Sequence, residues 1–223
     1  MAKLNKRLVA LVFICLSAWV CASSLLIEFN ERLMTWVNTQ YGDAAQQRVA
    51  SWEQTLLQAQ GKDITAQLSD INAFFNAYAF VSDQEHWSQL DYWATPIEFI
   101  GTNAGDCEDY SIAKYVSLRA IGIPESKLRL VYVKAIVLDQ AHMVLAYYPT
   151  PRSIPLILDN LNRAVLPADQ RSDLRFIYSF NGVGLWTAKA QGRGRQLQPG
   201  GNNRLWADLH RKIEQQTPIS IGE

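Results

Sequence analysis

Residues 105–110 read Gly-Asp-Cys-Glu-Asp-Tyr and mark the point where a polar, glycine-containing loop passes into an apolar segment. The loop begins at Gly101, and the next helix-breaking residues after it are Gly122 and Pro124. Between these limits the apolar residues recur at helical spacing. The pattern predicts a helix that starts near Asp106 and has Ile112, Ala113, Val116 and Ala120 on its buried side.

The segment before this loop is predicted to be helical. Apolar residues recur at three- and four-residue steps from Ile64, with Asp63 as the expected N-cap. Two further helices are expected at 28–41 and 44–60, and an apolar turn at 97–100.

After Pro124 the hydrophobic period changes to two, and β-branched residues become frequent. Residues 191–203, rich in glycine and arginine, are predicted to form a connecting loop. Helices followed by hairpin-like strands indicate an α+β fold, with N-terminal helices packed on an antiparallel sheet. The predicted strands are 128–133, 142–148, 154–161, 175–180 and a weaker one at 185–188, with a closing helix at 204–216.

The N-terminus has the pattern of an export signal. Lys3, Lys6 and Arg7 precede an apolar run at 8–20, and small residues at 21–24 provide a cleavage site after Ala22. The apolar run is shorter than a typical membrane span of about 20 residues, so a cleaved signal at 1–22 is favoured over a retained anchor. Either way, the rest of the chain is expected on the outer side of the inner membrane, in the periplasm.

Residues 23–223 are long enough for a single domain with a substantial core. The chain has 21 basic and 21 acidic residues; the signal holds three of the basic ones and none of the acidic ones, which leaves a net charge of −3. A nucleic-acid-binding protein usually carries an excess of basic residues on one face. The charge balance therefore argues against nucleic acid as a partner.

Cys107 is the one cysteine outside the predicted signal, which holds Cys15 and Cys21. A single exported thiol has no partner for an internal disulfide and is open to oxidation. At a helix N-terminus the unpaired amides and the helix dipole favour the thiolate, which is the nucleophilic form. These features indicate a reactive cysteine rather than a packing residue.

Two later residues complete a catalytic set. His142 stands near the start of a predicted strand and is suited to accept the thiol proton. Asp159, at the polar end of the next strand, is suited to bind the far imidazole N–H and orient the ring. The order of helix cysteine, strand histidine and strand aspartate predicts a Cys-His-Asp triad.

Three acids flank the predicted nucleophile: Asp106, Glu108 and Asp109. Acids at a helix N-terminus stabilise the helix by about 0.3–1 kcal/mol each. Carboxylates beside a thiolate, however, raise its pKa, which opposes activation unless a cation neutralises them. A hard cation with oxygen ligands, most simply calcium, would resolve this conflict.

The motifs at 105–110, 141–145 and 158–160, with the approach sequence at 93–99, resemble those of the bacterial transglutaminase-like cysteine proteinases, and in particular the LapG-type periplasmic proteases. The resemblance covers roughly 65–190 and includes all three predicted catalytic positions. It implies a papain/transglutaminase-like core and a calcium-dependent endopeptidase, with Asp106, Glu108 and Asp109 matching positions implicated in calcium dependence.

The resemblance also implies a substrate and a partner. The substrate is a large surface adhesin, cut near a dialanine-type site in its N-terminal region, which releases the adhesin and controls biofilm attachment. The partner is an inner-membrane cyclic-di-GMP receptor of the LapD type that sequesters the protease.

Other functions use similar residues. An exported transglutaminase or deamidase acts on glutamine side chains with the same Cys-His-Asp set. A cell-wall peptidase usually carries a wall-binding repeat, and the sequence contains no such repeat. An inactive binding module would not be expected to keep all three residues.

Overall fold

The computed structural model describes residues 27–182, 184–187, 196–199 and 204–216. The predicted export signal at 1–22 lies outside these described residues. Within them, none of the helices is both long and apolar enough to cross a membrane. The helices are α1 (Glu31–Tyr41), α2 (Asp43–Ala59), α3 (Ile64–Phe75), α4 (Asp83–His86), α5 (Pro96–Thr102), α6 (Cys107–Ala120) and α7 (Arg204–Gln216).

The strands form a large antiparallel sheet in the order β6-β5-β4-β3-β7-β8-β9, and a separate parallel pair, β1 with β2. Two short 3-10 turns, η1 (Glu125–Lys127) and η2 (Ala168–Gln170), connect strands to their neighbours. The strands are β1 (Ala79–Phe80), β2 (Ala104–Gly105), β3 (Leu128–Ala135), β4 (Gln140–Tyr147), β5 (Leu156–Leu158), β6 (Leu166–Pro167), β7 (Leu174–Asn181), β8 (Gly184–Thr187) and β9 (Gln196–Pro199).

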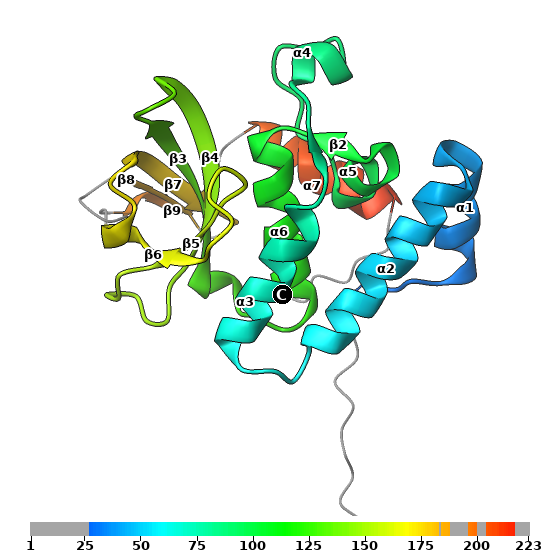
Figure 1. Cartoon of the computed structure of the whole chain (residues 1–223), viewed down its shortest axis with the longest axis horizontal. Coiled ribbons are helices and arrows are strands. Elements are labelled where there is room, and N and C mark those ends of the chain that lie inside the picture. The colour runs from blue at the N-terminus through cyan, green and yellow to red at the C-terminus, as the bar shows by residue number, and fades with distance from the viewer. Residues whose placement is uncertain (1–26, 183, 188–195, 200–203, 217–223) are drawn as a thin grey trace, which may run out of the picture.

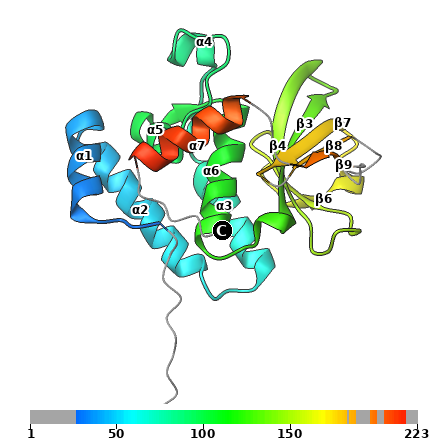
Figure 2. The same cartoon turned by 180° about the vertical axis from the view of Figure 1, so that it is seen from behind.

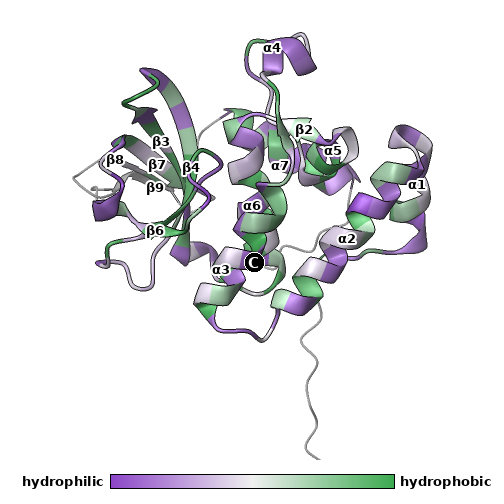
Figure 3. Cartoon of the chain, in the orientation of Figure 1, coloured by the Kyte–Doolittle hydropathy of each residue, from purple (hydrophilic) through white to green (hydrophobic). Residues whose placement is uncertain are grey.

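The helices and the sheet lie side by side (Figures 1 and 2). Helix α6 stands between them: it packs against β3 and β4 on one side and against α3 and α5 on the other. Helices α1 and α2 form the outer part of the helical layer, and Figure 3 shows hydrophilic and hydrophobic stretches alternating along them. This architecture confirms the predicted α+β fold with N-terminal helices and an antiparallel sheet.

The core follows from the alternation of side chains in β3. Leu128 and Leu130 face the helices and join the main hydrophobic cluster, whereas Val131 and Val133 belong to a second cluster on the opposite face. Both faces of the central strands are therefore covered, and β4 is buried continuously from His142 to Tyr147.

Most predicted boundaries agree with the structure. The Asp63 side chain accepts the Ala66 N–H at 3.0 Å and caps α3, as expected. Three expectations were wrong. The turn at 97–100 lies inside α5, which is closed at its N-terminus by a capping box between Thr95 and Glu98. The strand predicted at 154–161 is limited to β5: Pro155 cannot donate to the ladder before its start, and after its end the Leu161 N–H donates to the Asp159 side chain. The loop predicted at 191–203 contains β9.

Candidate active site

The N-terminus of α6 is fixed by the acids around it. The Asp106 side chain accepts the Glu108 N–H at 3.3 Å, and Asp109 Oδ2 accepts the Asp106 N–H at 3.3 Å, which completes a capping box. Cys107 is the first residue of the helix, as the sequence predicts. The two capping acids therefore have a structural role and also bring negative charge close to the Cys107 thiol.

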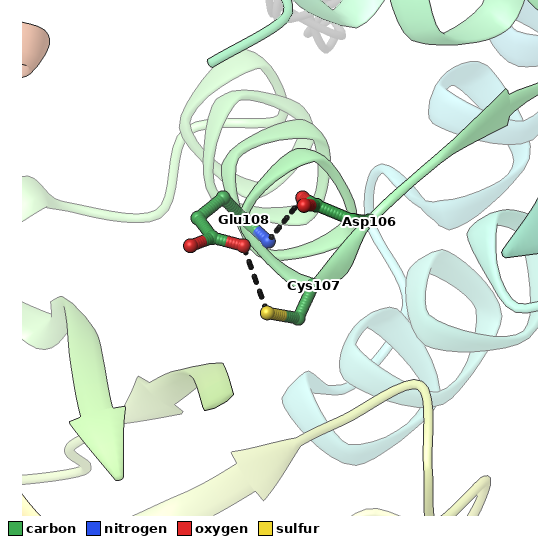
Figure 4. Close-up of side chains that lie close together, drawn as sticks. All are labelled: Asp106, Cys107 and Glu108. Carbon is green, nitrogen blue, oxygen red and sulfur yellow. Dashed lines mark hydrogen bonds between the residues drawn. The ribbon is translucent and has the colours of Figure 1, made fainter. Parts of the chain in front are cut away.

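The Cys107 thiol lies between a carboxylate and the sheet. Its Sγ donates to Glu108 Oε2 at 2.8 Å (Figure 4). Burial and then the charge of Glu108 raise the pKa of Cys107 well above its ordinary value, while the backbone N–H of Met143 acts in the opposite direction. Met143 directly follows His142 in β4, so the thiol lies beside the strand that carries the predicted base.

His142 and Asp159 form a buried pair. His142 Nε2 and Asp159 Oδ1 are 2.7 Å apart, and both residues are almost fully buried. Burial raises the pKa of Asp159, but hydrogen bonds from His142, Arg171 and the Leu161 backbone outweigh it and set the pKa to about 2. Asp159 is therefore a carboxylate at neutral pH. Because Nε2 of His142 faces Asp159, Nδ1 is the ring nitrogen that could accept the thiol proton.

The structure thus brings the predicted His142 and Asp159 into direct contact and places Cys107 against the residue next to His142. Among the residues that the structure describes, the side chain bonded to Cys107 Sγ is that of Glu108 and not the imidazole of His142. Engagement of the thiol by His142 remains a prediction.

The acids separate into two groups that share Asp106. One consists of Asp106, Cys107 and Glu108; the other consists of Asp83, Asp106 and Asp109, and in each the potential ligand atoms lie within 4.8 Å of one another. Glu108 turns toward the thiol, whereas Asp106 and Asp109 face Asp83 from α4. The three predicted metal residues are close together, but they do not form one set.

The Asp83 group has the properties of a cation site. Asp83 is buried, and its Oδ1 has no hydrogen-bond partner in the described part of the chain. Burial raises the pKa of Asp83 to about 6. Burial and the charge of Glu108 together raise the pKa of Asp106 to about 8. Burial and the charge of Asp106 also raise the pKa of Asp109 well above its ordinary value. Clustered buried carboxylates with an unpaired oxygen fit a hard cation such as calcium.

Sequence reasoning missed two residues at this site. Asp83 lies in a four-residue helix, and only the parallel pairing of β1 with β2 brings its segment to the nucleophile loop. Arg171 follows η2 and binds Asp159 Oδ2 at 2.5 Å. Neither position has a local motif that would reveal its role.

Comparisons with known proteins agree with this geometry. Residues 38–188 match the family model described as bacterial transglutaminase-like cysteine proteinase. Among solved structures, EGTA-treated Legionella pneumophila LapG is 38% identical, with a TM-score of 0.72 over 82% of this chain and 96% of that one. The calcium-bound LapG of the same organism is also 38% identical, with a TM-score of 0.71 over 82% and 98%. A search of curated proteins found no match.

Proposed function

Since this chain belongs to the bacterial transglutaminase-like cysteine proteinases, we propose that it is a calcium-dependent periplasmic endopeptidase. In this proposal Cys107 is the nucleophile, His142 is the base, and Asp159 orients the base. The observation that carries this proposal is the buried 2.7 Å contact between His142 and Asp159, beside the thiol at the N-terminus of α6. A histidine held in this way at a helix-terminal cysteine is the arrangement required for thiol nucleophilic catalysis.

The reaction follows from the roles of these residues. His142 takes the Cys107 proton through Nδ1, and the resulting thiolate attacks the peptide carbonyl carbon. The Cys107 backbone N–H, which lies in the first turn of α6 where amides lack an intrahelical partner, stabilises the oxyanion. The imidazolium then protonates the leaving amine, which gives a thioester. Water deprotonated by His142 attacks the thioester, and release of the acid restores the thiol.

Calcium fits the carboxylates of Asp83, Asp106 and Asp109. When bound, the cation supplies positive charge that neutralises these acids next to the thiol. The calcium-bound and EGTA-treated forms of LapG support calcium as the cation, and the proximity of the three carboxylates supports these residues as its ligands. Asp106 belongs to both groups of acids, so charge neutralised in the Asp83 group also reduces the negative potential at Cys107.

The substrate and partner are proposed from the family resemblance. The substrate is a large surface adhesin cut in its N-terminal region at a dialanine-type site, so that cleavage releases the adhesin and controls biofilm attachment. The partner is an inner-membrane cyclic-di-GMP receptor of the LapD type. The export signal predicted at 1–22 supports a periplasmic location for this chain, where it could meet both an inner-membrane receptor and the N-terminal region of an adhesin.

The test is incubation of residues 23–223 with the N-terminal fragment of the host's large adhesin, followed by intact-mass analysis. Wild type and Cys107→Ala are compared, each with calcium and with EGTA. We expect one cut with wild type and calcium, no cut with Cys107→Ala, and little or none with EGTA. Cleavage by the Cys107→Ala protein would exclude the mechanism. Ammonia release without chain cleavage would favour the deamidase instead.

Calcium binding has its own measurement, calorimetric titration of the folded protein. Asp83→Asn is expected to weaken binding by about tenfold or more, because it removes a charged ligand from a buried site. The matched control is Glu85→Gln, an exposed acid in the same helix. Unchanged binding by Asp83→Asn would remove Asp83 from the proposed site.

A further inference from the structure

A buried arginine stands behind Asp159. The Arg171 side chain has no exposed surface, and its Nη2 lies 2.5 Å from Asp159 Oδ2. The same guanidinium binds Asp173 through Nε at 2.9 Å and Nη2 at 2.7 Å. Arg171 therefore joins a fully buried carboxylate to one whose side chain is 43% exposed.

The two oxygens of Asp159 have different partners. Oδ1 faces His142 at 2.7 Å and also accepts the Leu161 N–H at 3.0 Å, whereas Oδ2 binds Arg171. A carboxylate free to rotate could exchange its oxygens, but here each oxygen is held by a separate group. The guanidinium thus fixes which oxygen is presented to the imidazole.

The backbone of Asp159 is held as well. Asn76, at the end of α3, donates from Nδ2 to the Asp159 carbonyl at 2.8 Å. The Oδ1 of Asn76 accepts from the buried Lys114 Nζ of α6 at 2.7 Å. The charged and titratable groups around Asp159 are thus His142 of β4, Lys114 of α6 and Arg171, with Asp173 beyond Arg171.

We propose that Arg171 is a positioning residue of the active site, which keeps Asp159 ionised and directs its Oδ1 to His142. The proposal rests on the proposed function, because it assumes that His142 is the base for Cys107. A buried ionised carboxylate needs a charged partner, and His142 is a full counter-ion only when it is protonated. Arg171 stays charged at all relevant pH values and supplies that partner in both states of the imidazole.

The alternative is that Arg171 only ties the η2 turn to the sheet through Asp173. The two roles predict different behaviour in acid. If Arg171 holds Asp159 ionised, replacing it raises the pKa of Asp159, so Asp159 gains a proton in mild acid and stops supporting the imidazolium. If Arg171 has only this structural role, replacing it changes the stability of the protein but does not shift the acid limb of the pH profile of thiol reactivity.

The test compares Arg171→Met with wild type, in the presence of calcium, by the rate of Cys107 alkylation with iodoacetamide as a function of pH. The thiolate forms the S–C bond and iodide leaves, so the rate reports the reactive thiolate without a peptide substrate. We expect the acid limb of the profile to move up by about one pH unit or more. With the peptide substrate we expect kcat to fall about 10- to 100-fold, because the variant loses a charged hydrogen bond to Asp159. We expect little change in KM.

Two controls separate the alternatives. Arg175→Met makes the same substitution at an exposed position of β7, and Asp173→Asn removes the other carboxylate bound by Arg171. Both are expected to keep the acid limb of wild type. Arg171→Gln, which keeps an N–H donor without the charge, replaces the Met variant if that protein does not fold, and the same shift is expected.

An unshifted acid limb and unchanged kcat in the Arg171 variant would overturn the proposal, as would an equal shift in Asp173→Asn. Failure of the proposed function is a separate result. If wild type cleaves no adhesin fragment, the endopeptidase assignment fails, yet the alkylation profiles still decide whether Arg171 acts through Asp159.

Discussion

The thiol of Cys107 is subject to opposing influences. Its place at the start of α6 favours the thiolate through the helix dipole and unpaired amides. Burial and the Glu108 carboxylate, 2.8 Å from Sγ, favour the protonated form and outweigh that effect among the groups of the chain itself. In the proposed mechanism, the reactivity of Cys107 therefore depends on a cation that neutralises the neighbouring acids and on proton transfer to His142, and not on its helix position alone.

Asp159 links the proposed active site to stability at the scale of one residue. Its pKa of about 2 in the folded chain lies below the value of 3.8 of an unperturbed aspartate. The unfolded state therefore binds more protons between these values, and the stabilisation is complete above about pH 4 and lost as the pH falls to about 2. The shift corresponds to roughly 2 kcal/mol.

Asp159→Asn is expected to abolish most peptidase activity and to remove this part of the acid dependence of stability. The measurement is the free energy of urea unfolding at pH 7, 4 and 2. Asp70→Asn, which removes an exposed ion pair with Lys62, serves as control and should change stability by less than about 1 kcal/mol. An acid dependence equal to that of wild type in Asp159→Asn would contradict the assigned shift.

At the scale of elements, the N-terminus of α6 combines structure and chemistry in one turn. Asp106 and Asp109 cap the helix and also face Asp83 of α4. The preceding strand β2 pairs with β1, which brings the α4 segment against the nucleophile loop. The helix start, the short parallel pair and α4 therefore depend on one another.

At Gly105 the surrounding side chains leave no space for a Cβ atom. A Cβ added there would lie 2.5 Å from Asp109 Oδ2 and 2.8 Å from a Phe99 ring carbon. Gly105→Ala is expected to destabilise the protein by about 1–3 kcal/mol and to weaken calcium binding, because Asp109 must move. Thermal unfolding and calorimetric titration measure the two effects.

Gly182→Ala is the matched control for this substitution. Its added Cβ meets the end of the Glu125 side chain at 2.4 Å, and that side chain is flexible enough to turn away. We expect a smaller loss of stability and unchanged calcium binding. Equal calcium affinity in Gly105→Ala and wild type would show that the site tolerates a shift of Asp109.

At the scale of the whole molecule, the site lies where the helical layer meets the sheet. Cys107 comes from α6, His142 from β4 and Asp159 from the end of β5. The relative position of the two layers thus sets the geometry of the candidate catalytic residues. Polar contacts as well as the core fix that position: Ser111 Oγ donates to the Met143 carbonyl at 3.1 Å, from α6 to β4.

The outer helices are tied to α6 by a buried hydrogen bond. Trp52 of α2 donates from Nε1 to Ser117 Oγ at 2.8 Å, and both residues are fully buried. Ser117→Ala leaves the indole N–H without a partner, and we expect a loss of about 1–3 kcal/mol in unfolding free energy. Ser117 lies about 15 Å along the helix from Cys107, so kcat of the folded protein should not change.

Chemical denaturation and steady-state kinetics test this pair of expectations. Ser51→Ala is the control, because its hydroxyl is exposed and bonds only within α2. A fall in kcat without a loss of stability would mean that Ser117 acts on the site rather than on the packing of α2.

The sequence by itself determined most of the elements and the choice of candidate catalytic residues. The Asp63 cap, the limits of α6 and the alternation of β3 follow from neighbours a few residues apart, since caps and hydrophobic periods are local properties. The candidate triad was predictable because Cys107, His142 and Asp159 each stand at or near an end of a predicted element. The shorter β5 and the helical α5 depend on pairing and capping that the period alone does not reveal.

The tertiary structure decided how the charged groups pair. Asp83 reaches Asp106 and Asp109 only through the pairing of β1 with β2, and Arg171 reaches Asp159 only through the turn after η2. The division of the acids, with Glu108 bonded to the thiol and Asp106 and Asp109 grouped with Asp83, likewise appears only in the folded chain. Burial sets the strength of charge interactions, and burial is a property of the packed chain rather than of any segment.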